Sequence, residues 1–72
     1  MSVEESIQSA IRERPDLVED VRRRVPKAWG QLAALSVVAF RRGAGRAPSH
    51  EERRAIWAGL WRVVTEDRGP MR

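Results

Sequence analysis

The residues of this 72-residue sequence whose types are best suited to binding or catalysis lie in one arginine-rich stretch, RRGAGRAPSHEERR, residues 41–54. Gly43 and Gly45 stand before a helix-forming segment, as glycines do in phosphate-binding loops. A dinucleotide-binding loop needs a third glycine and a preceding strand, however, and a Walker loop ends in Gly-Lys-Ser or Gly-Lys-Thr. The two glycines and Pro48 are more typical of a turn between two helices. The amides that open the next helix, with Arg46 nearby, leave open a weaker alternative, an anion site.

Residues suited to catalysis or metal binding are few. His50 is the only histidine, cysteine and tyrosine are absent, and His50 is expected in the exposed first turn of a helix. A catalytic base needs an orienting partner and a pocket. The four pairs of neighbouring acids diverge by about 100° on a helix, so they cannot act as paired carboxylates. Ala47 occupies the place that glutamate takes in a Glu-x-x-His metal motif. The sequence therefore predicts a non-enzymatic protein without cofactor or metal.

Basic residues are concentrated in the middle of the chain. Residues 21–48 carry seven of them and no acid, whereas residues 1–20 carry six acids and two arginines. Such a segment indicates a surface for phosphates of a nucleic acid. The alternative is that these arginines are solvated and pair with acids one helical turn away, such as Glu19 and Asp20. The candidate phosphate contacts are Arg22, Arg23, Arg24, Lys27, Arg41, Arg42 and Arg46.

The segment SHEERRAIWAGLWRVVTEDR, residues 49–68, predicts an amphipathic helix with an unusually wide apolar arc of roughly 160°. One flank of this arc can face a neighbouring helix. Trp57 and Trp61, four residues apart, form a second flank that either completes the protein's own core or meets a partner. A membrane surface is disfavoured because the polar face mixes acids with bases. The predicted partner interface comprises Trp57, Trp61, Leu60 and Val64.

Helix start and stop signals place these residues on helices. Ser2, Asp16 and Ser49 each precede an acid by three residues, which is the pattern of a capping box. Pro26 suits the first turn of a third helix, although the second and third helices could also be one helix kinked there. Gly43 is the expected cap at the end of the third helix. The predicted helices span about 3–13, 16–24, 26–42 and 49–67.

The whole chain is predicted to be a single all-α domain, residues 1–72, a bundle of three or four helices whose last two form an antiparallel hairpin. More than two-thirds of the residues should be helical. With no cysteine, packing or a partner must stabilise so short a chain. The longest apolar run, residues 28–40, is too short to span a bilayer, and the N-terminal segment does not resemble a signal peptide, so a cytoplasmic location is expected.

Two functions are compatible with these features. The favoured one is a small helical interaction module or accessory subunit that forms a homodimer or docks on a larger protein through its Trp-bearing face. The alternative is an arginine-rich accessory or regulatory protein that binds nucleic acid.

Overall fold

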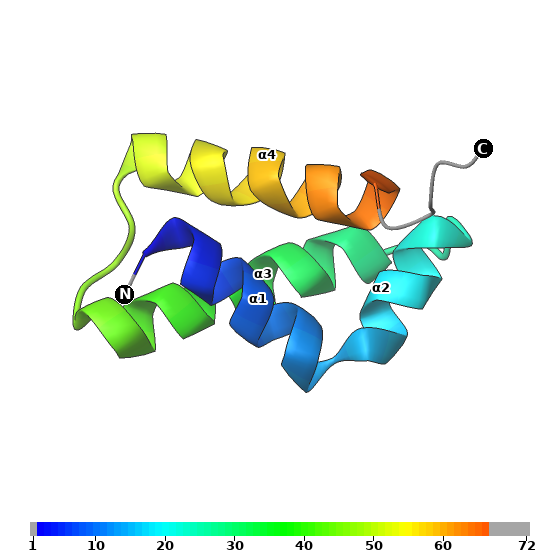
Figure 1. The fold of residues 1–72 in the computed structure, drawn as a ribbon, viewed down its shortest axis with the longest axis horizontal. Helices are drawn as coiled ribbons and strands as arrows, with labels where there is room; N and C mark the ends of the chain where they lie inside the picture. Colours follow the sequence, from blue (N-terminus) through cyan, green and yellow to red (C-terminus); the bar gives the residue numbers. More distant parts are fainter. Residues whose placement is uncertain (1, 67–72) are drawn as a thin grey trace.

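The computed structural model describes residues 2–66, which form four α-helices and no strand (Figure 1). The all-α prediction is confirmed, and the helices account for more than two-thirds of the chain. The helices are α1 (Val3–Glu13), α2 (Pro15–Arg22), α3 (Ala28–Ala44) and α4 (His50–Glu66).

Two of the three predicted capping boxes are present. The Glu5 N–H donates to Ser2 Oγ at 3.1 Å while Glu5 Oε1 accepts from the Ser2 N–H at 2.9 Å, and Ser49 and Glu52 repeat this pair of bonds before α4. The predicted cap at Asp16 is wrong, because α2 already begins at Pro15 and has no side-chain cap. Proline at this first position needs no hydrogen-bond partner for its nitrogen. Asp16 instead accepts two hydrogen bonds from the Arg14 guanidinium, at 3.0 and 2.8 Å.

The second and third helices are separate and are joined by a tight corner. α2 ends at Arg22, and Pro26 belongs to a turn instead of starting α3. Arg24 and Lys27 adopt left-handed conformations with φ of 62° and 72°. A chain that twice enters this region cannot continue as one kinked helix.

α3 continues two residues beyond its predicted end. Gly45, with φ of 75°, is the C-cap, and its N–H donates to the Arg41 carbonyl at 2.9 Å. The prediction of Gly43 as the cap is wrong, because Gly43 lies within the last turn of the helix. Only the left-handed position at the end of the helix needs glycine.

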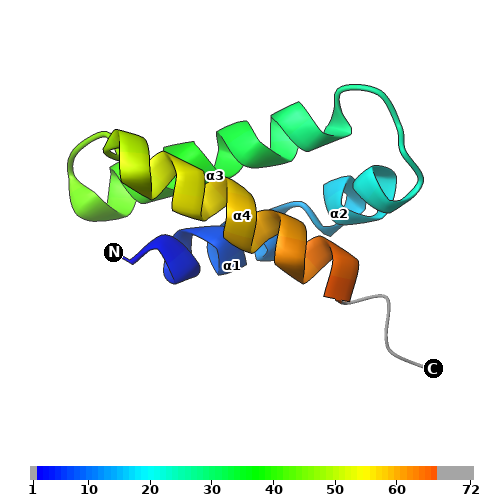
Figure 2. The same cartoon turned by 90° about the horizontal axis from the view of Figure 1, so that it is seen from above.

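α3 and α4 run in opposite directions, as predicted, and they cross at an angle (Figures 1 and 2). α1 packs against both, more extensively than they pack against each other. Its approach to α4 is close at Gly59, where an added Cβ would lie 2.7 Å from Ile7 Cδ1. The central core residues are Ile7, Ala10, Leu17, Val18, Leu32, Ala33, Phe40, Ile56, Leu60 and Val64.

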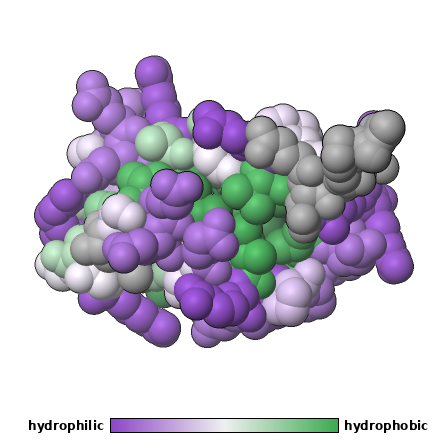
Figure 3. Space-filling model, in the orientation of Figure 1, coloured by the Kyte–Doolittle hydropathy of each residue, from purple (hydrophilic) through white to green (hydrophobic). Residues whose placement is uncertain are grey.

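The polar groups inside this core are satisfied locally. Ser6 and Ser36 are fully buried, and each hydroxyl donates to a carbonyl one turn earlier in its own helix, at 2.7 and 3.1 Å. On the face shown in Figure 3, hydrophobic surface gathers in the middle and hydrophilic side chains surround it. None of the four helices, within the described residues, combines the length and apolar character that a membrane span requires.

Candidate functional site

A groove of about 540 Å³ lies between α3 and α4. The direct packing of α3 on α4 is limited, and α1 packs more extensively against each of them. Small side chains of α3 line part of it, and larger apolar ones complete it. Its lining residues are Trp29, Gly30, Ala33, Ala34, Val37, Val38, Arg53 and Trp57.

Two tryptophans of α4 stand at the surface beside this groove. Trp57 is 45% exposed and Trp61 is 55% exposed. The Trp61 ring meets the Trp29 ring edge to face, with 5.5 Å between centroids and an angle of 84°. This contact, within the range that favours aromatic pairs, ties the outer part of α4 to the start of α3.

The predicted partner interface divides into two parts. Leu60 and Val64 are 0% and 2% exposed and lie in the core, so they offer nothing to a partner in this structure. Trp57 and Trp61 remain at the surface, and we call them the Trp57/Trp61 surface. The contribution of α3 was not foreseen from the sequence. The 17-residue helix has apolar side chains in most directions, so its pattern marks no particular side as a groove.

Positive charge borders the groove at both ends. Arg53 lines it directly, and Val38 joins it to a second hollow whose lining includes Arg41 and Arg42. Beyond the Trp29 end, the Trp61 ring that contacts Trp29 lines a separate hollow together with Arg22 and Arg24. α3 itself contains no acidic residue. Among the described residues, none of those that line the groove is acidic either.

The seven candidate phosphate contacts form two clusters. Arg22, Arg23, Arg24 and Lys27 precede α3, whereas Arg41, Arg42 and Arg46 lie at its other end. A helix of 17 residues separates its ends by roughly 25 Å. The structure therefore does not bring the whole set together.

Arg22 and Arg23 already have partners within the protein. Arg22 Nε donates to the Val64 carbonyl at 3.1 Å, and its guanidinium lies 3.5 Å from Glu19. Arg23 lies 4.0 Å from the same carboxylate. The pairing with Glu19 that the sequence suggested is therefore present, and Arg22 also ties α2 to α4.

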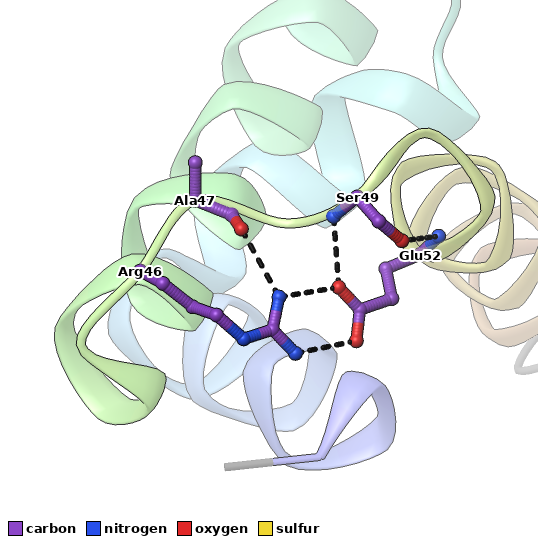
Figure 4. Close-up of polar contacts among 4 residues, drawn as sticks. All are labelled: Arg46, Ala47, Ser49 and Glu52. Atoms are coloured by element: carbon purple, nitrogen blue, oxygen red, sulfur yellow. Dashed lines mark hydrogen bonds and ion pairs between the residues drawn. The ribbon is translucent and has the colours of Figure 1, made fainter.

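Arg46 is held in the loop before α4 (Figure 4). Its guanidinium donates to both oxygens of Glu52 at 2.8 and 2.9 Å, and to the Ala47 carbonyl at 3.1 Å. It also lies over the Phe40 ring, 5.3 Å from the centroid. Glu52 Oε1 accepts the Ser49 N–H as well. The sequence left open an anion site at Arg46 and the amides before α4. In the structure, the Glu52 carboxylate already binds Arg46 and one of these amides.

The Arg46–Glu52 contact also makes the Glu52 carboxyl more acidic. The hydrogen bonds from Arg46, followed by the backbone hydrogen bond at Ser49, lower the pKa of the Glu52 carboxyl from 4.5 to about 2. The carboxylate therefore stays ionised in the folded protein far into the acidic range.

No group of three or more His, Cys, Asp or Glu side chains within residues 2–66 is placed to hold a metal ion. His50 lies exposed at the first position of α4. Within the described part of the chain, the arrangement best suited to binding is thus the α3–α4 groove with the Trp57/Trp61 surface. Comparison with protein-family models, curated proteins and solved structures finds no match to this chain.

Proposed function

We propose that the protein is a small, non-enzymatic interaction module or accessory subunit that buries the α3–α4 groove and the Trp57/Trp61 surface against another chain. One observation carries the proposal. Trp57 and Trp61 remain half exposed beside an apolar groove, although other side chains fill the core.

The exposed area of the two rings would contribute to association. Tryptophan offers roughly 200 Å² of surface, so two half-exposed rings leave about 200 Å² in contact with water. At about 25 cal/mol per Å², burying it contributes roughly 5 kcal/mol before the costs of association are subtracted. Tryptophans in apolar clefts are also frequent centres of binding energy in protein interfaces.

The partner is either a second copy of the chain or a larger protein. Nucleic-acid binding stays the alternative prediction. The basic residues on which it depends lie in two clusters at opposite ends of α3, and Arg22, Arg23 and Arg46 have partners among the described residues.

Substitution of Trp57 by glutamate tests the proposal. Trp57→Glu and Trp61→Glu should abolish association while far-ultraviolet circular dichroism remains helical, because a charge in a desolvated contact is costly. Ala55→Glu introduces the same charge at another exposed position of α4 and is the matched control. Mass in solution, alone and after affinity purification from the producing cells, is the measurement.

Two results would contradict the proposal. Loss of helical structure in both tryptophan variants would assign the rings to the protein's own core. Equal mass and equal partner retention for the wild type, Ala55→Glu and both tryptophan variants would show that these side chains are merely exposed.

A further inference from the structure

We propose that the occupant of the α3–α4 groove is an amphipathic helix of another protein, with apolar residues on one face and acidic residues along its flanks. This inference rests on the proposed function and names the chemistry of its partner. Shape and charge support it separately.

The shape of the groove suits a helix. Gly30, Ala33 and Ala34 lie on one side of α3 and have almost no side-chain bulk, so a helix of a partner protein can approach α3 closely. Trp29 and Trp57 supply the larger apolar contacts. Such grooves bind helices through apolar residues spaced three and four apart.

The charge around the groove calls for an acidic partner. Arg53 lines it, and Arg41 and Arg42 lie beyond its Val38 end. Arg24 lines a separate hollow with Trp61, whose ring contacts Trp29 at the other end. Glu13 of α1 is one acid near this charge, since it lines a further hollow with Val38 and Arg42. The acids of α4 do not offset the charge. Glu52 is held by Arg46, and Glu51 lies about 120° around the helix from Trp57.

A second copy of this chain does not meet the requirement. Its acidic helices are α1 and α2, whose apolar faces are already buried in the core through residues such as Ile7 and Leu17. A two-fold contact between two grooves would place one arginine-bordered end against the other. Like charges facing each other across an interface disfavour that contact.

Two other classes of partner fit less well. Tryptophan and arginine also occur in surfaces for anionic membranes and for single-stranded nucleic acid. The site here is a groove between two helices, not a protruding apolar face, and its lining is apolar except for Arg53. Both classes are included in the test.

The test uses the full chain and three synthetic peptides of about twenty residues. The peptides share one leucine and alanine face and carry glutamate, glutamine or lysine along the flanks. Binding is followed by tryptophan emission and calorimetry at low salt. We expect the glutamate peptide to bind at least about tenfold tighter than the glutamine peptide, and the lysine peptide to bind weakest.

Arg53→Glu should weaken binding of the glutamate peptide about tenfold and reduce its advantage over the lysine peptide. Arg62→Glu makes the same charge change at an exposed position of α4 that lines a hollow against α1. It should leave the affinity within about twofold of the wild type. Equal affinities for the three peptides, or equal effects of the two variants, would overturn the acidic-helix assignment.

Further outcomes separate this inference from the proposed function. A low-salt dimer that Trp57→Glu dissociates would make a second copy the occupant. Tighter binding of phosphatidylglycerol vesicles or oligo-dT than of the glutamate peptide would assign the groove to a membrane or to nucleic acid. Each of these overturns the inference. If no peptide binds but Trp57→Glu still abolishes partner retention, the inference fails and the proposed function stands. If neither effect is seen, both fail.

Discussion

At the scale of single residues, Glu52 organises the connection between α3 and α4. Its carboxylate binds the Arg46 guanidinium and the Ser49 N–H, and its own N–H donates to Ser49 Oγ at 3.1 Å. One side chain therefore closes the loop and caps the following helix. An ionised carboxylate in the first turn is also favoured by the helix dipole.

Replacing Glu52 should make the protein less stable above about pH 4.5 and change little near pH 2. The pKa of Glu52 is lowered from 4.5 to about 2 in the folded protein, so the stability it contributes is present above the higher value. That contribution is lost as the pH falls from one value to the other. Urea unfolding of wild type and Glu52→Gln across this range should give curves that converge at low pH.

Glu51→Gln is the matched control for this prediction, because Glu51 is the exposed neighbour of Glu52. Glu5 and Asp16 also have lowered pKa values, through hydrogen bonds at Ser2 and from Arg14, and they act equally in both proteins. A difference between wild type and Glu52→Gln that stays constant from pH 7 to pH 2 would contradict the role of the carboxylate charge.

At the scale of helices, local signals predicted the existence of every element but not all of its limits. The serine caps at Ser2 and Ser49 are correct because a hydroxyl and an acid three residues later satisfy each other without help from the rest of the fold. Pro26 misled the prediction because its fixed φ suits either a first helical turn or a tight turn. Either Gly43 or Gly45 could end α3, and the local sequence does not decide between them.

The crossing of α1 and α4 predicts a coupled pair of substitutions. Gly59→Ala adds a methyl group at a point 2.7 Å from Ile7 Cδ1, which is buried. Alanine improves helix propensity by about 1 kcal/mol, but overpacking costs about 1–3 kcal/mol. We therefore expect a net destabilisation of about 1 kcal/mol. In an Ile7→Val background, where the clashing methyl is absent, the same substitution should be neutral or stabilising.

Urea unfolding of the four proteins in this cycle measures the coupling directly. Gly30→Ala is a control for helix propensity, because an added Cβ there would meet no atom of the described residues within 4 Å outside its own helical turn. It should stabilise the protein by about 1 kcal/mol at most. Additive effects of Gly59→Ala and Ile7→Val would mean that the two helices do not meet as described.

The candidate site could be predicted only in part, because the sequence does not show which helix faces pack against each other. The apolar arc of α4 was evident, but its division depends on where the other helices pack. In the fold, Leu60 and Val64 are buried, whereas Trp57 and Trp61 stay exposed. The α3 wall of the groove could not be recognised, since a helix that is apolar on most sides gives no sign of which side stays open.

At the scale of the whole molecule, charge and apolar surface are segregated. Residues 21–48 contain no acid, and they contribute the α3 side of the groove and both clusters of cations near its ends. All six acids of residues 1–20 lie on α1 and α2, whose apolar faces turn inward. The net charge of +4 therefore understates how positive the surroundings of the groove are.

This segregation predicts opposite salt dependences for two kinds of association through the groove. Binding of an acidic helix brings unlike charges together, so its affinity should fall several-fold between 0.02 and 0.5 M NaCl as screening increases. Contact between two copies brings arginines together, so self-association should be weakest at low salt and should strengthen as salt screens them. Sedimentation equilibrium of the pure chain at both salt concentrations, with Trp57→Glu as the control that lacks the apolar contact, measures the second effect. A dimer that forms at 0.02 M and dissociates at 0.5 M NaCl would mean that unlike charges meet between copies, contrary to the distribution of charge around the groove.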